Sequence, residues 1–155
     1  MLSQLKRLSL EAEGRYATDA DLAFLKSYLQ SAQQRLNAYE KIRDGEEAIM
    51  EQASAKIRAV DPQVFHKGVQ DYSEVCLRDR KKTLCHVSAA MLFNDLDRLR
   101  DGLLLWQRTL VRAVKDEHAS TLTWREMPGI LREHLTAEEA DLMMPALQLT
   151  QALLN

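Results

Sequence analysis

Apolar residues recur every three or four positions along most of this chain, which is the spacing of an amphipathic α-helix. The first long stretch starts at Thr18-Asp19-Ala20-Asp21, a sequence typical of a helix N-terminus, and continues to about Ile42. The residues expected to face inward from this helix are Leu22, Leu25, Leu29 and Leu36.

A second helix is predicted after Asp44-Gly45-Glu46-Glu47, because this sequence fits a capping box. Asp61-Pro62 should end it, since the residue before a proline disfavours the helical conformation. Its inward residues would be Ile49, Ala53 and Ile57.

The second half of the chain predicts four further helical segments. A long one should cover residues 69–93, and another should begin at Asn94-Asp95 with Leu99, Leu103, Trp106 and Leu110 inward. A third covers residues 124–134. Thr136-Ala137-Glu138-Glu139 then caps the last helix, in which Pro145 should introduce a kink rather than an end.

Signals for β-strands are nearly absent, because the chain has neither an Asn-Gly hairpin turn nor a long alternating run. We therefore expect an all-α fold without a β-sheet. About seven helices of unequal length without heptads favour globin-like packing over a coiled coil. Residues 1–155 are predicted to form a single domain, with residues 1–16 as a helical extension projecting from it.

Composition narrows the classes of function. The formal net charge of −2 gives no basic footprint for nucleic acid, and no apolar run is long enough to cross a bilayer. The only two cysteines, Cys76 and Cys85, lie on opposite sides of one predicted helix and cannot pair there. Free thiols are typical of proteins in a reducing cytoplasm, so we expect a cytoplasmic location.

The most informative motif is Cys76-Leu77-Arg78-Asp79, followed by Arg80 and Thr83. It places a thiol, a guanidinium and a carboxylate within four positions of a helix, with Asp79 one turn beyond Cys76. These groups suit an anionic, nitrogen-rich tetrapyrrole. By itself, however, the pattern also fits a buried cysteine beside a surface ion pair.

Other candidate chemistry is weaker. The four histidines lack metal-ligand spacing, and His86 is either a haem ligand or an ordinary hydrogen-bonded histidine. Arg80-Lys81-Lys82 is most simply a solvated face, with a cationic rim for ligand carboxylates as the functional alternative. No catalytic triad or nucleotide loop stands out, so catalysis is not indicated.

Several motifs along the whole chain resemble the phycobiliproteins, the globin-like light-harvesting subunits related to allophycocyanin and phycocyanin. They lie near the start, at the cysteine and near the end of the chain: Glu13-Gly14-Arg15-Tyr16, Leu25-Lys26-Ser27-Tyr28, Gln34-Arg35-Leu36, Cys76-Leu77-Arg78-Asp79 and Leu135-Thr136-Ala137-Glu138-Glu139-Ala140. The resemblance implies a globin-like fold and a bilin cofactor, such as phycocyanobilin or biliverdin.

The resemblance also implies roles for individual residues. Cys76 matches the family's bilin-attachment cysteine, Asp79 the aspartate that bonds the pyrrole nitrogens, and Arg78 the arginine that pairs with a propionate. Arg80, Lys82 and Thr83 complete the candidate bilin-binding set. Because Cys76 has Arg78 and residues 80–82 nearby, we expect some thiolate character at its sulfur.

Departures from the family pattern point away from an antenna role. Lys82 and Thr83 stand where antenna subunits have two tyrosines, and Cys85 stands where an arginine pairs with an acid that matches Glu11. The chain is therefore similar to the bilin-biosynthesis-associated globins.

Three functions follow as hypotheses. The first is a non-enzymatic bilin-binding globin that accepts bilin from haem oxygenase or a bilin reductase and dimerises through its N-terminal helices. The second is a phycobilisome antenna subunit. The third is an interaction module that binds either no ligand or haem.

Overall fold

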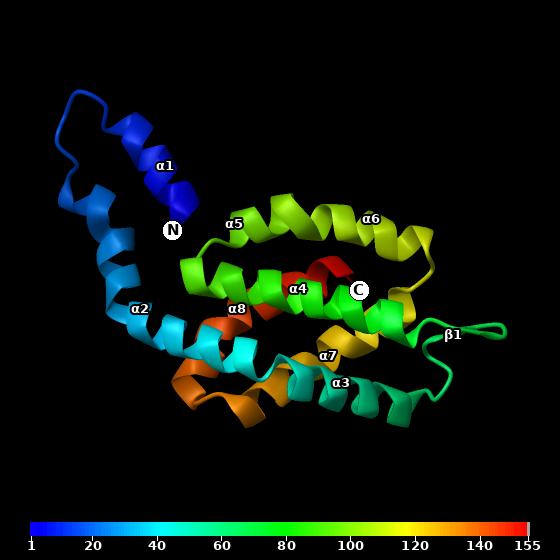
Figure 1. Ribbon diagram of the computed structural model, residues 1–155. Helices are drawn as coiled ribbons and strands as arrows, with labels where there is room; N and C mark the ends of the chain where they lie inside the picture. The colour runs from blue at the N-terminus through cyan, green and yellow to red at the C-terminus, as the bar shows by residue number, and fades with distance from the viewer. Residues whose placement is uncertain (155) are drawn as a thin grey trace.

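Helix α4, Ser73–Phe93, carries the cysteine motif and lies at the centre of the computed structural model, which describes residues 1–154 (Figure 1). It packs against α2, α3, α5 and α8. In Figure 1, α5 and α6 lie along one side of α4, α2 and α3 lie along the other, and α8 passes behind it. Helix α7 packs against α3 and α8. Every long element is a helix, as expected for a globin-like fold.

The chain forms its elements in the following order. The helices are α1 Leu2–Glu11, α2 Asp19–Asp44, α3 Glu46–Val60, α4 Ser73–Phe93, α5 Leu96–Leu99, α6 Leu105–Ala113, α7 Glu117–His134 and α8 Ala137–Leu154. A π-helical segment, Arg100–Leu104, joins α5 to α6. Two short strands, β1 His66–Lys67 and β2 Gln70–Asp71, precede α4.

The main hydrophobic core lies where α2, α3, α4, α7 and α8 meet. Its fully buried side chains include Ile49, Leu84, Trp124, Met127, Ile130, Met143 and Leu147. A smaller cluster joins Ile57 of α3 and Phe65 to Ala119 and Leu122 of α7. The inward positions predicted for α3 are confirmed, since Ile49, Ala53 and Ile57 are all buried.

Two predicted helix starts are confirmed by their capping bonds. The Thr18 hydroxyl accepts from the Asp21 N–H at 3.2 Å, and the Asp21 carboxylate accepts from the Thr18 N–H at 2.9 Å. Thr136 and Glu139 make the same reciprocal pair at the start of α8. Glu139 also receives the Lys41 ammonium at 2.7 Å, which joins α8 to α2. Pro145 lies inside α8 and does not end it.

The predicted capping box at residues 44–47 is wrong. Gly45 occupies the cap position without a side-chain bond, and the Asp44 carboxylate pairs instead with the Arg43 guanidinium at 2.7 Å. Helices α2 and α3 therefore follow each other with a single intervening residue. A Cβ on Gly45 would lie 2.9 Å from the Lys41 carbonyl oxygen, so this junction requires glycine.

The long helix begins four residues later than predicted, because residues 66–71 form a hairpin. His66 pairs with Asp71 and Lys67 with Gln70 across a two-residue turn. Gly68 has φ +64°, a conformation that glycine adopts without steric cost. The expectation of no β-sheet is thus wrong, because this hairpin forms a short two-stranded antiparallel sheet.

The inward face predicted after residue 94 holds for Leu99 and for the partly buried Leu103, which packs against the core, but is wrong for Trp106 and Leu110. In the π-helical segment one extra residue is accommodated, so the buried positions become Leu99, Leu104 and Val111. Trp106 and Leu110 are consequently exposed at 63% and 40%. Asn94, in the left-handed conformation at φ 47°, ends α4 immediately before this change.

The N-terminal extension is helical, as predicted, but its first turn is fastened to the body of the protein. The Ser3 N–H and hydroxyl donate to the Asp95 carboxylate at 2.7 and 2.8 Å. No residue of α1 is buried. On α2, Leu29 and Leu36 are exposed, whereas Arg35, Ala38 and Ile42 face the core. The inward assignment of Leu29 and Leu36 is therefore wrong.

Candidate ligand-binding site

A cavity of about 460 Å³ lies between α4, α6, the beginning of α7 and the β1–β2 hairpin. Its apolar wall consists of Val75, Leu103, Trp106, Leu110, Val111, Val114 and Trp124. Its polar lining includes Lys67, Cys76, Asp79, Arg80, Lys82, Thr83, His86, Gln107 and Asp116. Of the six residues in the predicted bilin-binding set, all except Arg78 line this cavity.

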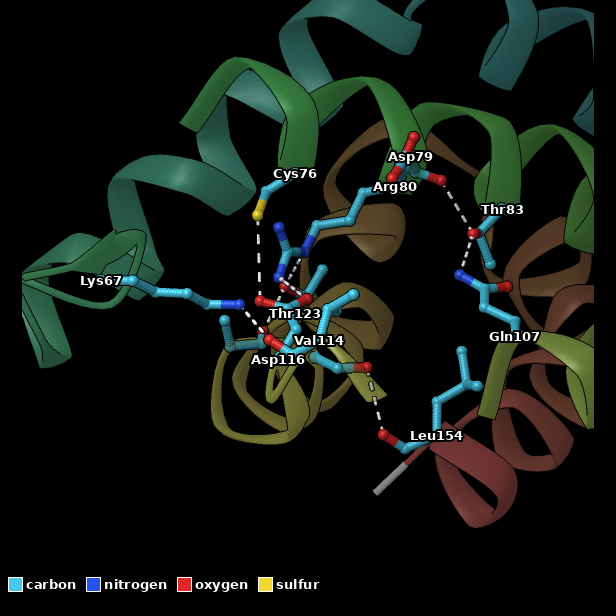
Figure 2. A network of polar contacts seen from close by, with 12 residues as sticks. Lys67, Cys76, Asp79, Arg80, Thr83, Gln107, Val114, Asp116, Thr123 and Leu154 are labelled. Carbon is cyan, nitrogen blue, oxygen red and sulfur yellow. Dashed lines mark hydrogen bonds and ion pairs between the residues drawn. The ribbon is translucent and has the colours of Figure 1, made fainter. Parts of the chain in front are cut away.

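Cys76 lines the cavity from the first turn of α4 (Figure 2). Its thiol is half-buried and donates to the Asp116 carboxylate with an Sγ–Oδ1 distance of 3.8 Å. Burial raises the pKa of the Cys76 thiol above its ordinary value of 9.0, and the Arg80 guanidinium opposes this rise without cancelling it. The expected thiolate character is therefore wrong, because a protonated sulfur is favoured at neutral pH.

Arg80 is a buried cation in the cavity wall. Arg80 is only 6% exposed. Its Nε donates to the Thr123 hydroxyl at 2.7 Å, and its Nη2 pairs with the Asp116 carboxylate at 3.1 Å. The guanidinium also lies 5.1 Å from the centre of the Phe65 ring, a cation–π distance. The interpretation of Arg80 as part of a solvated face is therefore wrong.

The other two residues of that basic run differ from Arg80. Lys81 pairs with the Glu47 carboxylate, and Lys82 is exposed at the edge of the cavity. Spacing alone could not separate these roles, because α4 is surrounded by neighbours on several sides.

Asp79 is half-buried and lies one turn along α4 from Cys76. Its Oδ1 accepts from the Arg78 Nε at 3.3 Å, and its backbone carbonyl accepts the Thr83 hydroxyl at 2.9 Å. Thr83 in turn receives the Gln107 side-chain NH₂ at 2.6 Å from α6. This chain of bonds, visible in Figure 2, fixes the wall between α4 and α6.

Arg78 points away from the cavity. It lies with Lys81, Lys82 and Cys85 around a shallower hollow of about 420 Å³ on another face of α4. Cys85 is exposed there, whereas Cys76 lines the cavity, so the two cysteines face different hollows beside α4.

His86 lines the cavity from an exposed position near its mouth. Within residues 1–154, no three His, Cys, Asp or Glu side chains are gathered closely enough to hold a metal ion. No helix in that part of the chain is both long and apolar enough to cross a membrane.

Sequence reasoning missed Gln107, Asp116 and Thr123, because each comes from an element other than α4. Asp116 carried one usable signal, since an aspartate before a helix is a common N-cap. It occupies that position at the start of α7, but its carboxylate serves Cys76 and Arg80 instead of the helix.

A family model described as "Phycobilisome protein" matches residues 8–153. The chain belongs to the phycobilisome protein family. The resemblance to phycobiliproteins is thereby confirmed, together with the all-α globin-like fold that it implied. Cys76 and Asp79, the positions that the resemblance assigns to bilin attachment and to the pyrrole nitrogens, both line the cavity of this phycobilisome-family chain.

Curated relatives are similar to this phycobilisome-family chain at low identity. The allophycocyanin alpha-B chain of Cyanophora paradoxa is 32% identical over 92 residues, 57% of each chain. The C-phycocyanin beta chain of Pyropia yezoensis is 26% identical over 148 residues, 85% of this chain and 86% of the relative. The C-phycocyanin beta chain of Porphyra purpurea is 29% identical over 108 residues, 67% and 63% of the two chains. Two of these three alignments thus span less than two thirds of the relative.

Proposed function

We propose that this protein binds a linear tetrapyrrole in the cavity beside α4 and serves as an accessory in bilin synthesis or transfer. The observation that carries the proposal is that Cys76, Asp79 and Arg80 all stand in the wall of one cavity. The chain also belongs to the phycobilisome protein family, and its resemblance to phycobiliproteins implies a bilin ligand. The protein would act by binding rather than by catalysis. Its two free thiols are typical of proteins in the reducing cytoplasm, where we place it.

The dimensions and lining of the cavity support a bilin-like ligand. A volume of about 460 Å³ falls within the range of about 300–1,000 Å³ that is usual for small-molecule sites. The apolar residues of α6, with Trp106 at the mouth, would cover the pyrrole rings. The half-buried Asp79 carboxylate would accept N–H bonds from the pyrrole nitrogens.

The state of the cysteine supports exchangeable binding. Addition of a thiol to a bilin requires the thiolate, and burial raises the pKa of the Cys76 thiol. A bilin beside Cys76 would therefore form a thioether slowly and leave more easily than a covalently held pigment. Such a site suits a protein that accepts bilin from haem oxygenase or a bilin reductase and passes it on.

Two features support this role over that of an antenna subunit. Lys82 and Thr83 replace rings that pack the chromophore in antenna subunits, so a bound bilin would retain more motion and lose excitation without emission. Glu11 pairs with Arg7 in its own helix, and Cys85 supplies no charge for a cross-subunit bond. The antenna alternative is favoured by the names of the relatives, which are phycocyanin and allophycocyanin chains.

The experiment that tests binding is a visible-absorbance titration of the purified protein with biliverdin and with phycocyanobilin. A saturable, red-shifted band is expected for at least one of them, and haem serves as the control ligand for the His86 alternative. Absence of a spectral change with either bilin would contradict the proposal, and a saturable haem band alone would favour the third hypothesis.

The role is tested by adding the globin to a haem oxygenase reaction. Faster turnover and weak emission of the bound bilin are expected. Bright red emission, or co-purification with phycobilisome rods or cores, would instead support the antenna role.

A further inference from the structure

Two buried polar atoms within residues 1–154 have no hydrogen-bond partner, and both belong to residues that line the same cavity. They are the Arg80 Nη1 and the Gln107 Oε1. Buried polar groups in folded proteins are nearly always paired, and leaving one unpaired costs about 1–3 kcal/mol. Both residues stand in the cavity wall, so a ligand that fills the cavity and displaces the side chains covering these two atoms could supply the missing partners.

The donor side of this pair is fixed by the bonds around Arg80. Its Nε is engaged by the Thr123 hydroxyl, whose own proton goes to the Ala119 carbonyl. Its Nη2 is engaged by Asp116, whose other oxygen receives the Cys76 thiol. A guanidinium nitrogen can only donate, so the free Nη1 calls for an acceptor.

The acceptor side is fixed by a similar argument. The Thr83 hydroxyl donates its proton to the Asp79 backbone carbonyl, so toward Gln107 it acts as an acceptor. The amide must then turn its NH₂ toward Thr83 and its oxygen away. This network of bonds assigns the orientation of the Gln107 amide, with Oε1 left to receive an N–H.

The charges around the cavity decide what kind of acceptor Arg80 would take. Lys67, Arg80 and Lys82 face Asp79 and Asp116, so three cations oppose two carboxylates, a net charge of +1 with His86 counted as neutral. A ligand with one carboxylate in the cavity would balance this charge. A carboxylate also accepts from a guanidinium more strongly than a neutral oxygen does.

We infer that the ligand of this cavity places a carboxylate on Arg80 Nη1 and an N–H on Gln107 Oε1. This inference rests on the proposed function and deepens it. Arg78, to which the family resemblance assigns a propionate, lies outside the cavity. The carboxylate contact would thus move two residues along α4 to a buried guanidinium, and α6 would add a contact of its own.

The carboxylate half is tested by titrating the wild-type protein with biliverdin and with its dimethyl ester, in which both carboxylates are masked. The ester should bind about tenfold more weakly, as expected for loss of a charge-assisted hydrogen bond. In Arg80→Gln the ratio of the two dissociation constants should fall to near one. In the matched control Arg78→Gln, on the same helix but outside the cavity, the ratio should stay at its wild-type value.

Equal affinity of wild type for acid and ester would overturn the inference while leaving bilin binding intact. A ratio that collapses in Arg78→Gln but not in Arg80→Gln would also overturn it. Failure of wild type to bind biliverdin in either form would overturn the proposed function together with the inference.

The N–H half is tested with Gln107→Met, which keeps the length of the side chain and removes the acceptor. It should weaken acid and ester alike, by about fivefold, because the N–H contact does not involve the carboxylate. Gln148→Met, at an exposed position of α8, is the control and should leave both affinities unchanged. Wild-type affinity in Gln107→Met would overturn this half. If circular dichroism shows that Arg80→Gln does not fold, the acid–ester ratio of wild type and of Arg78→Gln still tests the carboxylate half, because equal affinities in wild type or a collapsed ratio in Arg78→Gln would overturn it.

Discussion

The Cys76 thiol and the Asp116 carboxylate lie 3.8 Å apart, with the sulfur as donor, although 40 residues separate them in the chain. A carboxylate in this position favours the protonated thiol, and burial acts in the same direction on its pKa. The Arg80 guanidinium, which pairs with the same carboxylate at 3.1 Å, holds the Asp116 side chain in place. Reactivity of the cysteine is therefore limited by its surroundings as well as by access.

Reaction of Cys76 with iodoacetamide should consequently rise steeply with pH. Because its pKa is raised above 9.0, the thiolate fraction is small near neutrality and grows through the alkaline range. The measurement is the alkylation rate of the Cys85→Ala variant from about pH 6 to about pH 10, followed by mass spectrometry. Cys76→Ala, which retains the exposed Cys85, is the comparison. A rate for Cys76 that is high and constant across neutral pH would mean that the sulfur is ionised after all.

Substitution of Asp79 by asparagine should weaken the red absorption band of bound bilin and shift it to the blue. Bonds from protonated pyrrole nitrogens to an ionised carboxylate contribute about 1.5–3 kcal/mol, and the amide keeps the size without the charge. The partner of Asp79, Arg78, is exposed, so the protein should remain folded. The visible spectrum and a thermal melt measure the two effects. A bilin spectrum identical to that of wild type would remove Asp79 from the site.

Stability should fall at acid pH partly through Glu139. Burial alone would raise its pKa, but bonds from the Lys41 ammonium and the Thr136 N–H outweigh burial and lower the pKa below 4.5. The ionised form is thus favoured by folding, and its contribution is present above the unfolded value and lost as pH falls through the folded one.

The measurement for Glu139 is the unfolding midpoint in urea between about pH 6 and about pH 3. Glu139→Gln should be less stable than wild type near neutrality and should show a smaller loss on acidification. Glu138→Gln, its exposed neighbour, is the control. Parallel curves for wild type and Glu139→Gln would contradict the assignment.

We also predict self-association through the N-terminal segment, residues 1–16. Leu10 and Tyr16 are exposed there, and Leu29 and Leu36 are exposed on the following helix α2. Deletion of residues 1–14 should shift the protein toward monomer in sedimentation velocity. Ser3→Ala, which loosens the link to Asp95 without removing the leucines, should retain the association. Full-length protein that is already monomeric at micromolar concentration would rule this out.

The helices were predictable where the sequence itself supplies the capping bonds. Thr18 with Asp21, and Thr136 with Glu139, act within four residues, so local spacing is enough to find them. The capping box at residues 44–47 failed because Asp44 had a competing partner, Arg43, next to it. Local patterns are thus reliable only when no stronger local bond competes.

The candidate site was predictable only on the side that α4 provides. Cys76 and Asp79 share a helix face, and the motif that contains them is short enough to recognise. The opposite wall depends on how α6 and α7 pack, which places Gln107 against Thr83 and Asp116 against Arg80. The role of Arg80 was misjudged for the same reason, since burial is a property of neighbours that are distant in sequence.

The orientation of α6 in the cavity wall depends on the number of residues in the π-helical segment Arg100–Leu104. An α-helix turns by about 100° per residue, so removing one residue from this segment would rotate all of α6 by about that angle. Gln107 would then leave Thr83, and Trp106 would leave the mouth of the cavity. A single deletion there could abolish ligand binding while every lining side chain is still present in the sequence.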